Sequence, residues 1–190
     1  SLGEASNLQR LYIGQTHLSD AGALSGLTGL RELTLSEVTL EDPASLAALA
    51  GLEQLRALHW IGPDVTDVSA LASLHTITEL TIGGQGFPSP TKNDALVDIS
   101  ALSGLTGLRE LTLNGNTALV DISALSNLSQ LTSLHLTETA VTDLSPVASL
   151  SELKHIGLPK QGVKDVSPLR ELHALEFLDL SEMTIADLSP

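Results

Sequence analysis

One eleven-residue stretch, SGLTGLRELTL, occurs twice in this sequence, at residues 25–35 and again at residues 103–113. It contains the pattern L-x-x-L-x-L, in which other large apolar residues can replace leucine. Eight copies of the pattern run along the chain, most of them 22 or 23 residues apart, and begin at Leu8, Leu30, Leu55, Ile77, Leu108, Leu131, Leu153 and Leu175. A unit repeated at a nearly fixed period predicts a solenoid, because each unit buries its apolar face against its neighbours.

Each copy predicts a short strand. Apolar residues alternate with polar ones, as at Leu33 and Leu35 beside Glu32 and Thr34, which is the period of a strand with one buried face. A strand of about five residues and two turns leave room only for a short helical return. We therefore expect an α/β solenoid with a parallel concave sheet of about eight strands and short 3-10 turns on the convex side.

The returning segments share the pattern D-[IVL]-S-[AP]-L in most copies. Aspartate takes the same place in all eight, at Asp20, Asp42, Asp67, Asp98, Asp121, Asp143, Asp165 and Asp187. We expect the serine two residues later to cap the helical turn, and the aspartate to accept hydrogen bonds from free backbone N–H groups of the turn. A ladder of cation sites is the alternative interpretation of this acidic column.

These residues resemble the leucine-rich repeat family, in the short class found in bacterial internalins and in a eukaryotic phosphatase regulator. The resemblance covers essentially all 190 residues and implies a right-handed arc with a role in protein recognition. The family's asparagine after the strand is kept only at Asn116, and other residues replace it at Thr16, Val38, Pro63, Gln85, Thr139, Gln161 and Met183. We therefore expect most of the family's asparagine ladder to be missing, with local irregularity near Pro63 and Met183.

Two insertions interrupt the period. The stretch EDPASLAALAGLEQL, residues 41–55, adds one three-residue unit to the return helix. Residues 87–95, FPSPTKNDA, are polar and proline-rich and predict an exposed insertion loop, either a tolerated bulge or a contact loop. Neither end of the chain carries a helical cap, so we expect a single domain, residues 1–190, that is a fragment of a longer protein or has its ends covered by flanking domains or by self-association.

Composition argues against several classes of partner. The chain contains no cysteine, so disulfides and thiolate nucleophiles are excluded. A formal net charge of −14 and an aromatic content of 2% argue against nucleic acid as a partner. No apolar stretch reaches the roughly 18 residues of a spanning helix, so we expect no membrane insertion.

The sequence also lacks the motifs of an active site. It contains no phosphate-binding loop, nucleophile elbow or dinucleotide fingerprint. His59 and His135 share a strand column but lie three repeats, about 14 Å, apart, which is too far for one metal ion. Glu32, Glu79 and Glu110 also share a column, and with arginines next to two of them they indicate solvated surface charge. We expect no enzyme activity, no cofactor and no metal site.

The concave face remains as the candidate site. Most of the basic residues fall at exposed positions that we place in or just after the strands, and several aromatic and histidine side chains point the same way. Arginine and aromatic residues are frequent anchors of protein interfaces. We expect a more basic concave face that binds protein through Tyr12, Arg31, Arg56, His59, Arg109, His135, Lys154 and Phe177. Trp60 and Phe87 occupy apolar positions of the pattern and are assigned to the core.

The function predicted from these features is non-catalytic protein recognition. The module would be the ligand-sensing or interaction arm of a larger bacterial protein, with a preformed surface for a partner of acidic or mixed charge. Three alternatives stay open: an internalin-like surface adhesion domain, a scaffold or regulatory subunit that positions an enzyme, and a structural spacer. The sequence leaves the partner's identity open, and it is compatible with either the cytoplasm or the cell surface of a bacterium.

Overall fold

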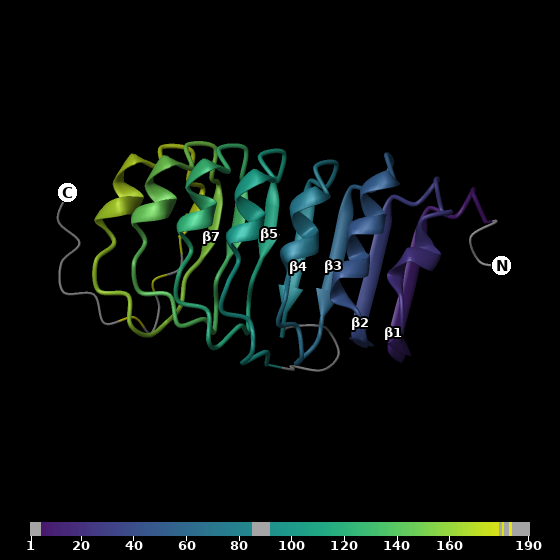
Figure 1. Ribbon diagram of the computed structural model, residues 1–190. Helices are drawn as coiled ribbons and strands as arrows, with labels where there is room; N and C mark the ends of the chain where they lie inside the picture. Colours follow the sequence, from purple (N-terminus) through teal and green to yellow (C-terminus); the bar gives the residue numbers. More distant parts are fainter. Residues whose placement is uncertain (1–4, 85–91, 179, 181–182, 184–190) are drawn as a thin grey trace.

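The structure, a computed structural model, describes residues 5–84, 92–178, 180 and 183. Eight parallel strands form one open sheet in the order of the sequence (Figure 1). The strands are β1 (Arg10–Leu18), β2 (Glu32–Leu40), β3 (Ala57–Ile61), β4 (Glu79–Gly83), β5 (Glu110–Thr112), β6 (Ser133–His135), β7 (His155–Gly157) and β8 (Phe177–Leu178). The predicted parallel sheet is confirmed, and every pair of neighbouring strands is joined by one returning segment.

The returns carry 3-10 helices, which form a row over one face of the sheet in Figure 1. They are η2 (Ala21–Leu24), η3 (Pro43–Gly51), η4 (Ser69–Ser73), η5 (Ser100–Gly104), η6 (Ser123–Asn127), η7 (Ser145–Ser149) and η8 (Ser167–Glu171). The nine residues of η3, against four or five in the others, confirm the extra unit predicted for that return. The fold is the predicted solenoid, with the sheet on the concave side and short helices on the convex side.

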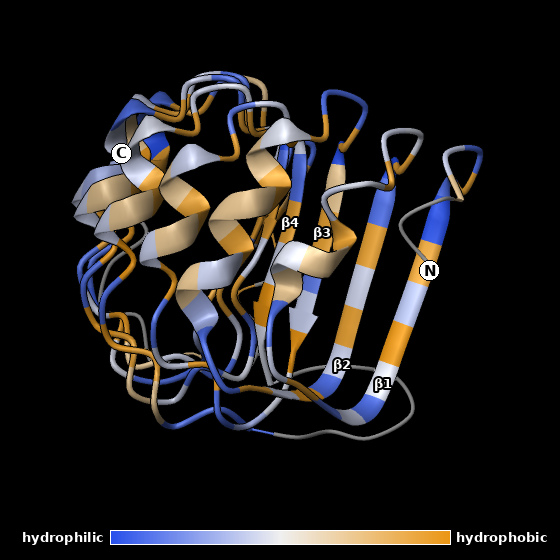
Figure 2. Ribbon diagram, turned by 45° about the vertical axis from the view of Figure 1, so that its right-hand side comes forward, coloured by the Kyte–Doolittle hydropathy of each residue, from blue (hydrophilic) through white to orange (hydrophobic). Residues whose placement is uncertain are grey.

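The core fills the space between the sheet and the helices. Along each strand the alternate residues are buried, as at Leu33, Leu35 and Leu58, and Figure 2 shows the resulting hydropathy bands along β1 and β2. Each fully buried leucine contributes about 1.5–3 kcal/mol of hydrophobic stabilisation. Trp60 joins this core at 3% exposure, as predicted, whereas Phe87 lies outside the described residues.

The two strands at the N-terminal end are longer than the sequence pattern predicts. β1 and β2 have nine residues each, and their pairing continues from Thr16 and Val38 to Leu18 and Leu40. β3 ends at Ile61, and the nearby Pro63 has no N–H group with which to extend the ladder. The residues of β2 after Ser36 therefore do not pair with β3. This is the irregularity expected near Pro63. For Met183 that expectation stays a prediction.

The aspartate column closes the returns by hydrogen bonding. In each of five repeats the Oδ1 atom of the aspartate accepts a hydrogen bond of 2.8 Å from the backbone N–H two residues later, and the aspartates are Asp67, Asp98, Asp121, Asp143 and Asp165. Asp20 and Asp42 accept equivalent bonds at 2.6 and 3.1 Å. The capping interpretation of the aspartates is confirmed, while Asp187 lies outside the described residues.

The serines act differently from the prediction. Each described serine of the pattern is the first residue of its 3-10 helix, as Ser69 is in η4, and the residue before it makes no side-chain capping hydrogen bond. The serine supplies the N–H donor, and the aspartate is the acceptor that caps the turn. The prediction that the serine hydroxyl caps the helix is therefore wrong, because the aspartate is placed two residues earlier, as in an Asx turn.

These hydrogen bonds also stabilise the ionised carboxylates. The Ser69, Ser100 and Ser123 backbone N–H groups, and then their hydroxyls, hold the pKa of Asp67, Asp98 and Asp121 below the usual 3.8. A lowered folded pKa gives stability that is present above the unfolded value and lost as the pH falls through the folded value.

We predict that the variant Asp67→Asn/Asp98→Asn/Asp121→Asn loses less stability than the parent as the pH falls below about 4. The asparagine side chain still accepts the N–H bond but cannot take up a proton, so its contribution does not change with pH. Urea unfolding at pH 5 and pH 3 measures the difference. The control variant Glu53→Gln/Glu152→Gln, at exposed positions, should keep the parent's pH dependence. An equally steep loss in the aspartate variant and the parent would contradict the prediction.

A buried pair of asparagines joins the fourth and fifth repeats. Asn93 and Asn116 are both 0% exposed and form a parallel bridge outside the named strands. The Nδ2 atom of Asn116 donates to the carbonyls of Ile82 at 2.9 Å and Leu113 at 2.7 Å. The Nδ2 atom of Asn93 donates to the Val65 carbonyl at 2.8 Å and to Oδ1 of Asn116 at 3.0 Å. Each amide thus satisfies polar groups that are shielded from water.

This pair corrects the expectations for the insertion. Within the predicted loop 87–95, residues 87–91 lie outside the described residues, but Asn93 is buried in the repeat, so the exposed loop does not extend to it. Asn93 pairs with Asn116, while Gln85, which the sequence pattern placed at the family's asparagine position, lies outside the described residues. The sequence contained a signal for this, because NDALVDIS at 93–100 matches NTALVDIS at 116–123 at seven of eight positions.

The asparagine pair leaves no space for a side chain at Gly83. Gly83 has a φ of +107°, and a Cβ atom there would overlap the amide of Asn116. Glycine is required because it tolerates this backbone conformation and leaves room for the amide. The pair is therefore part of a tightly packed junction between repeats.

We predict that Asn116→Ala lowers the free energy of unfolding by about 2–4 kcal/mol, because two carbonyls and the Asn93 amide lose their buried partner. Chemical denaturation followed by circular dichroism measures this change. The exposed Asn127→Ala is the matched control and should stay within about 0.5 kcal/mol of the parent. A loss below about 1 kcal/mol for Asn116→Ala would show that the buried amide is not needed.

Candidate functional site

The strands present two columns of side chains on the face opposite the 3-10 helices, and we call these columns together the concave face. The register of the sheet defines both. The first column contains Arg10, Glu32, Ala57, Glu79, Glu110, Ser133, His155 and Phe177. The second contains Tyr12, Thr34, His59, Thr81, Thr112, His135 and Gly157. The core residues of the strands lie between these positions, so the concave face follows directly from the alternation.

Aromatic rings stand at both ends of the concave face. Tyr12 on β1 is 67% exposed and Phe177 on β8 is 64% exposed. The Tyr12 ring lies over Gly14, where a Cβ atom would be only 2.7 Å from ring atom Cε1. Two large exposed rings on an otherwise polar face are candidates for interface anchors.

His59 lies among polar groups of the next strand. Its Nδ1 atom is 3.0 Å from Oγ1 of Thr81, and its Nε2 atom is 3.6 Å from Oε1 of Glu79. The ring is therefore held between β3 and β4, and protonation would convert its contact with Glu79 into an ion pair.

A second histidine group lies on β6 and β7. The Nε2 atom of His135 is 3.0 Å from Oγ of Ser133, and a Cβ atom on Gly157 would be 3.1 Å from its Nδ1 atom. Partial burial and then the neighbouring His155 hold the pKa of His135 below the usual 6.5, against the opposite effect of Glu110. Histidines and a carboxylate from three successive strands thus interact on the concave face.

Four of the predicted site residues lie elsewhere than expected. Arg31, Arg56, Arg109 and Lys154 come one residue before β2, β3, β5 and β7, so their placement in or just after the strands is wrong. They form a separate row, the basic edge, in which the carbonyl of each residue accepts hydrogen bonds from the next repeat, as Arg31 does from Arg56 at 2.9 Å. The chain is still turning into the strand there, which the alternating pattern did not indicate.

Two side chains of the basic edge have partners near the edge. Nη1 of Arg56 donates to the carbonyls of Glu53 at 2.8 Å and Leu55 at 2.9 Å, in the turn before β3. Nζ of Lys154 is 3.0 Å from Oε1 of Glu176 in the next repeat. The expected basic character belongs to this edge, whereas the columns of the concave face carry three glutamates and one arginine among their described residues.

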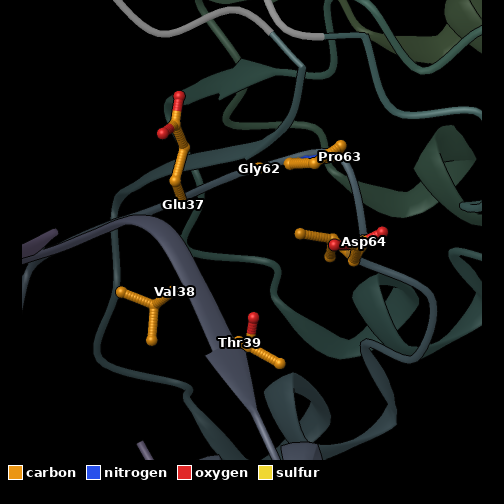
Figure 3. A pocket seen from close by; sticks show the side chains of 7 residues that line it. Glu37, Val38, Thr39, Gly62, Pro63 and Asp64 are labelled. Atoms are coloured by element: carbon orange, nitrogen blue, oxygen red, sulfur yellow. The ribbon is translucent and has the colours of Figure 1, made fainter. Parts of the chain in front are cut away.

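A small hollow lies away from the concave face, where β2 runs past the end of β3. Figure 3 shows its lining from the end of β2, including Glu37 and Thr39, and from the turn at Gly62, Pro63 and Asp64. The hollow arises from the broken pairing near Pro63.

The described part of the chain shows neither a cluster of metal ligands nor a helix that could span a membrane. No three histidine, aspartate or glutamate side chains there converge on one point as metal ligands would. No helix within the described ranges is long and apolar enough to cross a membrane. The described concave face combines aromatic, imidazole, hydroxyl and carboxylate groups in rows along the sheet, an arrangement suited to contact with another macromolecule.

Comparisons with known proteins agree with this architecture. No protein-family model matches the sequence, and no curated protein matches it. The structure of internalin inlF from Listeria monocytogenes is similar with a TM-score of 0.70 and 27% identity, over 91% of this chain and 48% of that chain. Internalin C2 of the same bacterium gives 0.68 and 27%, over 92% and 82%. A leucine-rich repeat protein of Leptospira interrogans gives 0.57 and 16%, over 92% and 49%, which shows the fold alone.

The sheet, the 3-10 returns and these neighbours define the class. The chain is a leucine-rich repeat solenoid with short repeats. Within this class its repeats resemble those of the bacterial internalins, and the chain spans about half the length of internalin inlF.

We predict that replacing His155 by glutamine raises the pKa of His135, because a like charge is removed, and that Glu110→Gln lowers it, because a favourable charge is lost. Imidazole signals followed by NMR during a pH titration measure both changes. His173→Gln, in the turn before β8, is the control and should leave the titration unchanged. No response to either concave variant would mean that the three groups do not interact.

Proposed function

We propose that the chain is a non-catalytic protein-recognition module whose concave face binds a protein partner. The observation that carries the proposal is the exposure of Tyr12 and Phe177 at the two ends of a polar concave face built on a rigid sheet. Every strand of that sheet is paired with its neighbour in sequence, so the surface is preformed and loses little conformational entropy on binding.

The similarity to internalins supports the same class of function. Leucine-rich repeat solenoids of this kind are commonly used for protein binding and are generally not enzymes. We infer that the chain is the interaction arm of a larger bacterial protein. Its predicted binding residues divide into a concave set, Tyr12, His59, His135 and Phe177, and an edge set, Arg31, Arg56, Arg109 and Lys154.

An internalin-like surface adhesion domain is the second candidate. The observation that favours it is the similarity to two Listeria internalins over more than nine-tenths of this chain. In this role the concave face would bind a protein on the surface of another cell, and the module would act outside the bacterium. The two candidates share the binding face and differ in where the partner is found.

We predict that Tyr12→Ala/Phe177→Ala loses a protein that the parent chain retains in affinity capture from extracts of the source organism. Loss of two exposed aromatic anchors should weaken binding by at least about tenfold. Val97→Ser/Val120→Ser, at exposed positions of the returns, is the matched control and should retain the partner. A third variant, Arg31→Glu/Arg56→Glu/Arg109→Glu, measures the contribution of the basic edge.

Circular dichroism confirms that each variant is folded before capture. A partner lost from the aromatic variant and kept by the control supports the concave face. Retention by the aromatic variant together with loss from the edge variant would move the site to the basic edge. Specific binding of the parent, and not of the aromatic variant, to intact cells of another species would favour the adhesion domain.

A further inference from the structure

The charge of the concave face depends on its histidines. Among the described residues of the two columns, Arg10 and the glutamates at positions 32, 79 and 110 give a net charge of −2 when the histidines are neutral. Protonation of His59, His135 and His155 would bring this charge to +1. Protonation of all three imidazoles would therefore reverse the sign of the charge on the two columns.

Each histidine of the concave face lies beside charged groups of neighbouring strands. His59 on β3 has Glu32 on β2 and Glu79 on β4 in the adjacent rows. His135 on β6 has Glu110 on β5 and His155 on β7 nearby.

His155 in turn lies near Glu176, which is paired with Lys154. The other cations of the basic edge, Arg31, Arg56 and Arg109, each come one residue before a strand, next to the first column.

The dimensions of the face fit an extended segment. Tyr12 and Phe177 lie on the first and last of the eight strands. At about 4.8 Å between neighbouring strands the rings are roughly 34 Å apart, and an extended chain of about ten residues covers this distance. Such a segment would cross all the carboxylates of the first column on its way from one ring to the other.

We propose that the concave face binds an extended, cationic segment of a protein partner at neutral pH and releases it when the three imidazoles become protonated. This inference rests on the concave binding proposed above and adds the partner's charge and its release by acid. Charge complementarity is the reason for the choice, since the centre of the face is anionic and its two ends offer aromatic contacts for cationic or apolar side chains.

The acidic residues of the returns are a less suitable surface for the same segment. Their carboxylates already accept hydrogen bonds from the turns, as Asp98 does from Ser100 and Asp121 from Ser123. Within the described part of the chain, Glu79 and Glu110 accept no hydrogen bond from a backbone N–H. Both stand in the first column, and each has a histidine of the second column nearby, His59 for Glu79 and His135 for Glu110.

The test uses two synthetic peptides of ten residues, lysine decamer and glutamate decamer, with the whole 190-residue chain. Binding is measured by calorimetry at pH 7.5 and pH 5.5, and backbone amide NMR shifts locate the binding surface. We expect the lysine decamer to shift amides of β3 to β7 at pH 7.5 and to bind about tenfold more weakly at pH 5.5. The glutamate decamer should shift none of these amides at pH 7.5.

Two pairs of variants separate the concave face from the general acidity of the chain. Glu79→Gln/Glu110→Gln should weaken lysine-decamer binding at pH 7.5 by about fivefold, whereas the control Glu53→Gln/Glu152→Gln, with the same net charge, should not. His59→Asn/His135→Asn/His155→Asn should bind equally at both pH values. His17→Asn/His75→Asn/His173→Asn, which replaces histidines outside the two columns, should keep the parent's pH dependence.

Amide shifts confined to the returns, equal weakening by both glutamate variants, or pH dependence that survives the concave histidine variant would overturn this inference. A protein partner captured through Tyr12 and Phe177 with equal strength at both pH values would also overturn it while leaving the proposed function intact. Loss of pH dependence only in the concave histidine variant supports the inference.

Discussion

The whole structure depends on a core that no single repeat can close. Each strand and its return bury leucines on one side only, and the next repeat supplies the opposite wall, as Leu33 and Leu58 do across neighbouring strands. The hydrophobic effect therefore favours stacking over any arrangement of isolated repeats. The same constraint makes the period nearly constant, because a repeat of different length must place its extra residues outside the strand, as η3 does.

Stacking creates a need for polar partners at every turn. A chain that reverses direction twice per repeat leaves backbone N–H and C=O groups without partners. The aspartate column satisfies donors at the start of the 3-10 helices, at the surface, and the pair Asn93 and Asn116 satisfies acceptors in the interior. The two kinds of hydrogen bond differ in their dependence on pH. The aspartate carboxylates can take up a proton, whereas the buried amides of Asn93 and Asn116 carry no charge.

The same alternation that builds the core determines which side chains the opposite face presents. Residues between the buried positions face solvent, so the described part of the sheet displays two columns of residues that the strands, and not loops, hold in place. Histidine, glutamate and aromatic residues occupy these columns, while most of the arginines stand before the strands at the basic edge. The two columns therefore mix carboxylates with imidazoles, and the cations of the basic edge form a row beside them.

The sequence by itself determined the solenoid, the parallel strand order, the 3-10 returns and the aspartate caps, because each is a local consequence of a pattern repeated eight times. It also identified Tyr12, His59, His135 and Phe177 as side chains of one face. The tertiary structure decided what depends on contacts between repeats. It placed Arg31, Arg56 and Arg109 at the edge, because the strands begin one residue later than the leucine pattern indicates. It also paired Asn93, which the sequence pattern assigned to the insertion loop, with Asn116, since a buried amide is satisfied by its neighbours in space.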